Sequence, residues 1–217
     1  MKSLFGFLFL IAAVNLSAQT TINNSTFGMM EARILGPGTM SGRISAIEGV
    51  NGDGKTIYVG TAGGGIWKTT NAQTATTGSG WTQIATTAVL GGSVSAIGIS
   101  WTNIDKMYIG TSNGRILVTS NNGANWSVLT GNPYVSDFIV DNANDNICYA
   151  TLGGTTGSHV LKTTDGGVTW TNITSNIPNI AANSILLRTA SPRMIFVGTD
   201  IGVFQSTDEG STWVSFN

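Results

Sequence analysis

Short apolar runs separated by polar turns fill most of the chain. After Gly42 the turns are rich in Gly, Asn, Asp and Ser, and the first four runs cover residues 43–50, 56–61, 65–69 and 81–85. Runs of this length and composition predict β-strands, and none keeps a helical period long enough to compete. This part of the chain is therefore predicted to form one four-stranded antiparallel sheet.

The same pattern of four runs recurs three more times. The second set covers 94–99, 107–111, 116–119 and 126–129, the third covers 135–140, 147–151, 159–163 and 170–173, and the fourth covers 184–189, 194–199, 202–205 and 213–216. The second run of each set reads IYVGT, MYIGT, CYATL or IFVGT. Apolar residues around a small one suit a strand that is covered on both faces. The pattern predicts an all-β fold of stacked four-stranded sheets.

An eight-residue segment before the last run of each set fixes the length of the repeat. The clearest copy is TTDGGVTW, which ends at Trp170; STDEGSTW ends at Trp213, TSNNGANW ends at Trp126, and a longer, looser copy ends at Trp81. These tryptophans are 45, 44 and 43 residues apart. A repeat of this length with several short strands matches a β-propeller blade better than a helical repeat. Four blades are predicted, over residues 42–87, 93–131, 135–175 and 182–217.

Each residue type in this segment, called the box below, has a mechanical role. The aspartate accepts backbone N–H bonds across a tight turn, the glycine supplies a positive φ, and the tryptophan is buried between neighbouring sheets. In the copy ending at Trp126, either Asn121 or Asn122 takes the place of the aspartate. The residues assigned to the structural boxes are Asn122, Gly123, Trp126, Asp165, Gly167, Thr169, Trp170, Asp208, Gly210, Thr212 and Trp213.

The box pattern resembles the Asp-box, or bacterial neuraminidase repeat, of sialidases, sortilin-type receptors and photosystem II assembly factors. The stretches GPGTMSGRISAI and IYVGTAGGGIWKTTN resemble the first blade of secreted bacterial propellers of the BNR-repeat and glycosyl-hydrolase-like kind. The resemblance covers residues 34–217 and implies that the boxes are structural. It also implies a ring of about six to eight blades. Four blades are then expected to be part of a larger propeller, which further blades of the same polypeptide complete.

Composition and the first residues indicate an exported protein. The net charge is −1 and only 10% of residues are charged, which excludes a basic surface for nucleic acid. Residues 1–18 read as a secretory signal peptide, with Lys2, an apolar run from Leu4 to Val14 and small residues before Gln19. A membrane anchor is the alternative, but about eleven apolar residues are too few to span a bilayer as a helix. We expect a secreted or cell-surface protein in which residues 19–41 lead into the first blade.

Few residues offer catalytic or metal chemistry. A sialidase resembling the box family would need clustered arginines, a tyrosine nucleophile and a glutamate partner, and the five arginines here show no repeated placement. His159 is the one histidine, which excludes a histidine-based metal site or triad, and the turn 51–54 lacks the later glutamate of a calcium loop. Cys148 is the one cysteine and is predicted to pack inside a strand. We expect no metal and no cofactor.

Loops at one end of the blades are the predicted recognition face. In a propeller, the loops before each first strand and between the second and third strands meet at the end of the channel opposite the boxes. This rule selects Arg43, Gly63, Gly64, Asn113, Arg115, Asp137, Asp200 and the loop 153–158. We predict a binding or scaffolding module for a protein or glycan ligand, without a membrane span after signal cleavage.

Asp200 supports a second interpretation. Its turn, Thr199 to Gly202, resembles one in secreted xyloglucan-cleaving enzymes, where a carboxylate of this kind would be one of a pair. The chain would then be a polysaccharide-directed hydrolase whose second carboxylate lies outside it. The structural alternative is a variable position in a turn, because the first and second blades carry Ala62 and Ser112 at the equivalent place.

Overall fold

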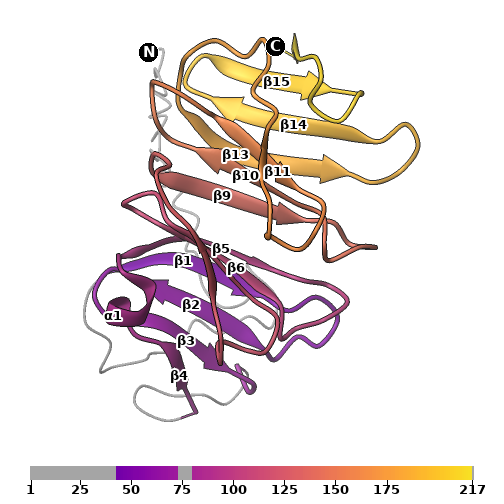
Figure 1. Cartoon of the computed structure of the whole chain (residues 1–217). Helices are drawn as coiled ribbons and strands as arrows, with labels where there is room; N and C mark the ends of the chain where they lie inside the picture. The colour runs from indigo at the N-terminus through magenta and orange to yellow at the C-terminus, as the bar shows by residue number, and fades with distance from the viewer. Residues whose placement is uncertain (1–42, 73–79, 217) are drawn as a thin grey trace, which may run out of the picture. The chain divides into compact units, whose positions relative to one another are not determined.

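The computed structural model of the chain describes residues 43–72 and 80–216 (Figure 1). The described residues form four four-stranded antiparallel sheets, each in simple sequential order. The predicted all-β propeller arrangement of about four blades is thereby confirmed. The predicted signal peptide, 1–18, and lead-in segment, 19–41, lie outside the described residues.

Each sheet is one blade of the predicted repeat. The first blade contains β1 (Ile44–Gly49), β2 (Ile57–Thr61), β3 (Gly65–Thr69) and β4 (Thr82–Ala85); the second contains β5 (Val94–Ile99), β6 (Met107–Thr111), β7 (Ile116–Thr119) and β8 (Ser127–Leu129); the third contains β9 (Val135–Val140), β10 (Cys148–Leu152), β11 (Val160–Thr163) and β12 (Thr171–Asn172); the fourth contains β13 (Ala182–Arg188), β14 (Met194–Thr199), β15 (Gly202–Ser206) and β16 (Val214–Ser215). The outermost strands begin one residue after each box tryptophan, not at it as predicted.

One short helix, α1 (Thr87–Leu90), joins the first and second blades, where the sequence had suggested no helix. Thr86 caps its start by accepting the Val89 N–H at 3.3 Å, and Gly91 ends it with φ of 69°. A single capped turn is too short to leave a 3.6-residue period, which is why periodicity missed it.

Consecutive blades pack face to face, and the first strands β1, β5, β9 and β13 lie beside one another in that order. Three apolar cores fill the three interfaces among the described blades. Because both faces of the middle blades are covered, every residue of β6 and β10 is buried. Three equivalent tyrosines, Tyr58, Tyr108 and Tyr149, are fully buried, one in each core.

Serine hydroxyls join the first strands of consecutive blades. Ser45 donates to the Val94 carbonyl at 2.5 Å, and Ser95 donates to the Val135 carbonyl at 2.6 Å. Ser136 repeats the bond with the Ala182 carbonyl, also at 2.6 Å. Each such bond contributes about 1 kcal/mol net. The blades are therefore fixed by polar as well as apolar contacts.

Each box aspartate accepts hydrogen bonds across its own turn. Asp165 accepts the Thr169 backbone N–H at 2.9 Å and the Thr169 hydroxyl at 2.5 Å, and Asp208 makes the same pair of bonds with Thr212. These bonds, the hydroxyl bond first, lower the pKa of both carboxyls to about 2. In the second blade the acceptor is Asn121, which takes the Asn125 N–H at 2.9 Å.

Each box also contacts the preceding blade through its glycine. Gly123, Gly167 and Gly210 have φ of 86°, 88° and 90°, so each adopts a left-handed conformation that favours glycine. A side chain at Gly167 would meet Val118 of the second blade, and one at Gly210 would meet Ile173 of the third. Asn122, the residue before Gly123, has φ of 55°, a conformation that asparagine tolerates.

The box tryptophans lie in equivalent interfaces but are not equally buried. Trp126 and Trp170 are half-buried against their cores, whereas Trp213 is only 2% exposed. Trp213 also donates its indole N–H to the Ile173 carbonyl at 2.8 Å, and buried Ile177 shares its core. The longer connection after β12 therefore covers the last tryptophan more completely.

Candidate functional site

The turns of each blade separate into two groups. The antiparallel order puts the turn between the second and third strands beside the segment that enters the first strand. We call this end of the blades the entry end. In the second blade, the Asn113 side-chain amide donates to the Gly91 carbonyl at 2.9 Å, so the turn after β6 lies beside the segment that leads into β5. The boxes lie beside the turns between first and second strands, as the Gly166 N–H to Asn146 carbonyl bond of 3.0 Å shows. The predicted recognition residues therefore belong to the entry end, and their role in recognition stays a prediction.

Arg115 lies where the first and second blades meet at the entry end. Its guanidinium covers Gly91, so that a side chain at Gly91 would overlap it. The Arg115 backbone N–H is held by the Thr111 hydroxyl at 2.9 Å. The buried Nε of Arg115 has no hydrogen-bond partner among residues 43–72 and 80–216. A half-buried guanidinium at this junction suits recognition of an oxygen-rich ligand.

Asp200 is oriented by an amide that sequence reasoning missed. Asn183, at the start of β13, donates its side-chain N–H to Asp200 Oδ1 at 2.7 Å, and both residues are exposed. Asn183 occupies the position of Ser45, Ser95 and Ser136 in the other blades. The sequence contained one signal for this contact, namely an asparagine at a position where the other three blades carry serine.

Asp137 is tied to the backbone of two blades. Its Oδ1 accepts the Phe138 N–H at 2.8 Å, and its Oδ2 accepts the Ile185 N–H of the fourth blade at 3.0 Å. Burial raises the pKa of Asp137, with the two backbone bonds opposing that rise. Burial also raises the pKa of Glu48 on β1, and the charge of Asp137 adds to it. Asp137 thus joins β9 to β13, a structural role the sequence did not predict.

The remaining predicted residues divide between the first and third blades. The Arg43 carbonyl accepts the Ala62 N–H at 2.9 Å, which places Arg43 beside the turn that contains Gly63 and Gly64. The Gly64 carbonyl accepts the Trp67 indole N–H at 2.9 Å. The loop 153–158 contacts Tyr134, whose carbonyl accepts the Gly153 N–H at 2.7 Å. Tyr134 is 45% exposed and is a second entry-end residue that the sequence analysis missed.

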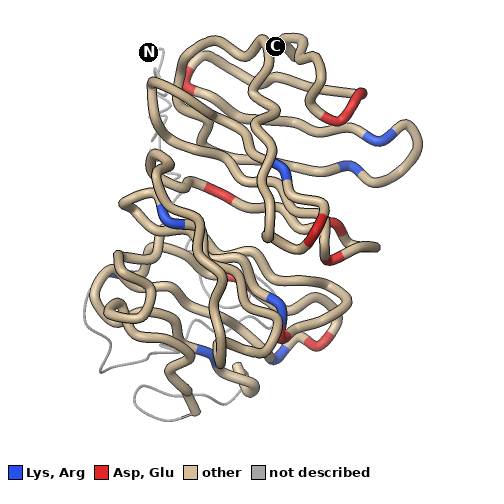
Figure 2. Tube along the Cα trace, viewed as in Figure 1, with Lys and Arg blue, Asp and Glu red and all other residues tan. Residues whose placement is uncertain are grey.

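Charged residues are sparse and scattered over all four blades (Figure 2). Within the described ranges no three His, Cys, Asp or Glu side chains gather as a metal site would require. His159 is 1% exposed and its Nε2 lies 2.8 Å from Asn179 Oδ1, and Cys148 is fully buried, which raises the pKa of its thiol. In the same residues no helix is both long and apolar enough to cross a membrane.

Three comparisons place this geometry among known propellers. A xyloglucanase from Hypocrea jecorina (strain QM6a) is 31% identical over 116 residues, which are 49% of this chain and 12% of that protein. The crystal structure of the GH74 enzyme from Niastella koreensis superposes with a TM-score of 0.64 and 18% identity, over 84% of this chain and 31% of that one. YCF48 from Cyanidioschyzon merolae gives a TM-score of 0.55 and 15% identity, over 82% and 57% of the two chains.

The structural similarities establish the fold alone, since their sequence identities are low. The chain spans 12% of the length of the xyloglucanase that it matches. The family assignment rests on a longer match that includes all four blades. Because residues 39–217 match the DUF6242 beta propeller domain, the chain belongs to that family.

Proposed function

We propose that this propeller is an exported module that binds a neutral polysaccharide of the glucan type through its entry end. The observation that carries the proposal is the Asn183 and Asp200 pair, an exposed carboxylate held at 2.7 Å by an amide. Carboxylates and amides of this kind hydrogen-bond sugar hydroxyls, and an exposed ring such as Tyr134 offers a flat apolar surface. The low net charge favours an uncharged ligand.

The finer identity of the repeat belongs to the same proposal. We infer that the boxes are of the Asp-box type, which is supported by the hydrogen bonds that Asp165 and Asp208 make across their turns. The export route is inferred from the signal-peptide pattern of residues 1–18. A sortilin-like or assembly-factor role would use the same scaffold with a protein ligand.

Binding without cleavage is favoured by the carboxylates available. Glycoside hydrolysis needs two carboxyl groups about 5 to 9.5 Å apart, one on each side of the bond. Asp137, the other aspartate of the predicted face, has both oxygens engaged by backbone N–H groups. The hydrolase alternative is supported by similarity to a xyloglucanase and would need a partner for Asp200 from outside this chain.

Binding and cleavage can be measured on the same protein. Affinity electrophoresis and calorimetry with xyloglucan and an unsubstituted β-glucan would report binding, and a reducing-end assay would report hydrolysis. Asp200→Ala and Arg115→Ala should each weaken binding by roughly tenfold, the loss of about 1.4 kcal/mol. Asp105→Ala, an exposed aspartate at the box end, is the control and should bind like the parent.

The outcomes separate the two interpretations. Retention on glucan gels without new reducing ends supports the binding module. Release of reducing ends that Asp200→Ala abolishes would replace it with the hydrolase. No retention of any glucan by the parent protein would reject the glycan ligand.

A further inference from the structure

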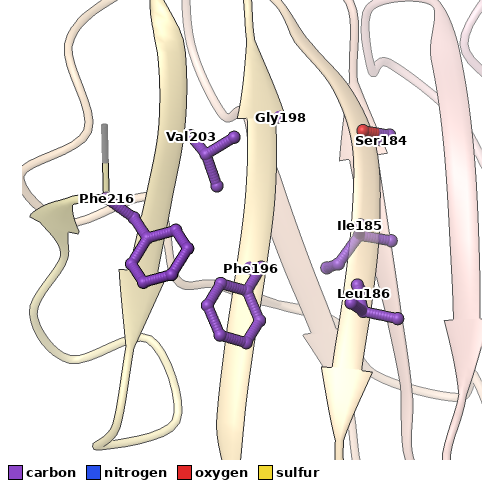
Figure 3. Close-up of a pocket in the computed structure, with 7 residues that line it drawn as sticks. All are labelled: Ser184, Ile185, Leu186, Phe196, Gly198, Val203 and Phe216. Atoms are coloured by element: carbon purple, nitrogen blue, oxygen red, sulfur yellow. The ribbon is translucent and has the colours of Figure 1, made fainter.

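The fourth blade carries an open apolar hollow on the face turned away from the third blade. The hollow has a volume of about 540 Å³ and is lined by Ser184, Ile185, Leu186, Phe196, Gly198, Val203 and Phe216 (Figure 3). Phe196 and Phe216 meet edge to face with centroids 5.2 Å apart. Leu186 and Phe216 remain 60% and 56% exposed. An apolar surface of this kind marks a contact site.

The other three blades show what normally covers this face. Phe196 stands at the position of Tyr58, Tyr108 and Tyr149, which are fully buried under the next blade. The Tyr58 hydroxyl donates to the Ile104 carbonyl at 3.1 Å, and the Tyr108 hydroxyl donates to the Asp145 carbonyl at 2.7 Å, both in the next blade. Phe196 has no hydroxyl and is only half-buried.

A glycine in the second strand receives a side chain from the next first strand. A Cβ at Gly60 would overlap Val94, and a Cβ at Gly110 would lie 2.5 Å from Val135 Cγ1. A Cβ at Gly198, the equivalent position, would meet only Ser184 of its own blade. We call the space over this glycine, which a side chain of the next blade fills, the seat. The seat over Gly198 in the fourth blade is therefore open.

The third blade shows that this seat is matched in size. Thr151 replaces the glycine there, and the residue of the next blade that corresponds to Val94 and Val135 is the smaller Ala182. Ser136 donates to the Ala182 carbonyl at 2.6 Å, and its hydroxyl oxygen lies 2.9 Å from the Thr151 hydroxyl. A glycine at position 198 thus calls for a β-branched partner of the size of Val or Ile.

A polar position on the same face is also unsatisfied. Lys68 donates to Asn122 in the box of the next blade at 3.3 Å, and Lys162 pairs with Glu209 of the box that follows it. Gln205 holds this position in the fourth blade, opposite Phe196. Its Oε1 is buried without a hydrogen-bond partner in the part of the chain that the structure describes. This face of the fourth blade therefore leaves a buried polar atom that a covering blade could reach.

The first blade presents the complementary edge. Ile44 and Ile47 of β1 are 55% and 63% exposed, although the equivalent Val94 and Ile97 of β5 are 1% and 6% exposed against the first blade. Ile44 is β-branched, like the valines that fill the seats at Gly60 and Gly110. The chain therefore carries both the seat and the side chains that fit it.

We propose that the outer face of the fourth blade binds the first-strand edge of another blade of this repeat type. For the 217-residue chain, that edge is β1 of a second copy. Ile44 lies over Gly198 and Ile47 packs against Phe196 and Leu186. The contact is heterologous, because a seat on one copy takes an edge from the other.

Two single-site variants test the proposal from opposite sides. Light scattering after size-exclusion chromatography should show concentration-dependent self-association of the parent chain. Gly198→Val fills the seat and Ile47→Asp charges the edge, and each should weaken association at least roughly tenfold. Leu186→Asp tests the seat a second time. Val168→Asp, at a 77% exposed apolar residue in a box turn, is the control and should associate like the parent.

Mixing the variants distinguishes this contact from general stickiness. Gly198→Val retains its β1 edge and Ile47→Asp retains its seat, so the mixture should form a one-to-one dimer that neither variant forms alone. Circular dichroism and melting curves verify that each variant is folded. A parent chain that is monomeric at all concentrations, or association that survives both substitutions, would overturn the proposal. Failure of the mixture to recover the dimer would do the same.

Discussion

The indole of Trp170 meets the ring of Tyr108 edge to face across the interface of the second and third blades, with centroids 6.1 Å apart and an interplanar angle of 90°. The Trp170 indole of the third blade thus covers the buried tyrosine of the second blade. Edge-to-face pairs of this kind contribute about 0.5 to 1.5 kcal/mol beyond the area they bury.

Removing these tryptophans should destabilise the chain unequally. Trp213→Ala should cost about 5 kcal/mol and Trp170→Ala about 3 kcal/mol, because Trp213 is almost fully buried and its hydrogen bond to Ile173 would also be lost. Urea unfolding followed by circular dichroism measures both. A Trp170→Ala protein that unfolds at the parent's midpoint would contradict the fastening role of the box.

The box glycine should resist substitution for two separable reasons. Gly167 and Gly131 both have φ of 88°, but a Cβ at Gly167 would lie 2.5 Å from Val118 Cγ2 and one at Gly131 would contact nothing within 4 Å. Gly131→Ala should therefore cost about 1 to 2 kcal/mol from backbone strain alone. Gly167→Ala should cost about 1 to 3 kcal/mol more, because it also overpacks the interface. Equal losses for the two variants would show that blade contact is irrelevant.

Acid should remove the contribution of the box carboxylates. The pKa of Asp165 is about 2 in the folded protein against an ordinary 3.8, mainly because the Thr169 hydroxyl and N–H donate to it. The folded state therefore favours the ionised form, and this stabilisation is fully present above about pH 4 and lost as the pH falls towards about 2. The difference in melting temperature between the parent and Asp165→Asn should shrink across that window. A difference that stays constant down to about pH 2 would argue against the linkage.

The serine bonds between first strands can be tested with a matched serine. Ser95→Ala leaves the buried Val135 carbonyl without its 2.6 Å donor and should cost about 1 to 3 kcal/mol. Ser184→Ala, on the open face of the fourth blade, should change stability by less than about 0.5 kcal/mol. Thermal unfolding of both variants makes the comparison, and a neutral Ser95→Ala would remove the polar link from the account of blade packing.

The repeat and its division into blades follow from the amino-acid sequence alone. Short apolar runs, turn residues and a tryptophan period of about 44 residues are local patterns. They can be recognised in the sequence because they do not depend on any long-range contact. The roles of Asp165 and Asp208 were predictable for the same reason, since each carboxylate bonds to a residue four positions later.

Features that depend on residues far apart in sequence became evident only from the folded chain. Asn183 orients Asp200 across 17 positions, and Asp137 holds Ile185 across 48. Burial of Trp213, choice of Asn121 as acceptor and exposure of the fourth blade's outer face all depend on which segment packs against which. A periodic sequence specifies what each blade offers to its neighbours, whereas packing determines which of those surfaces is covered.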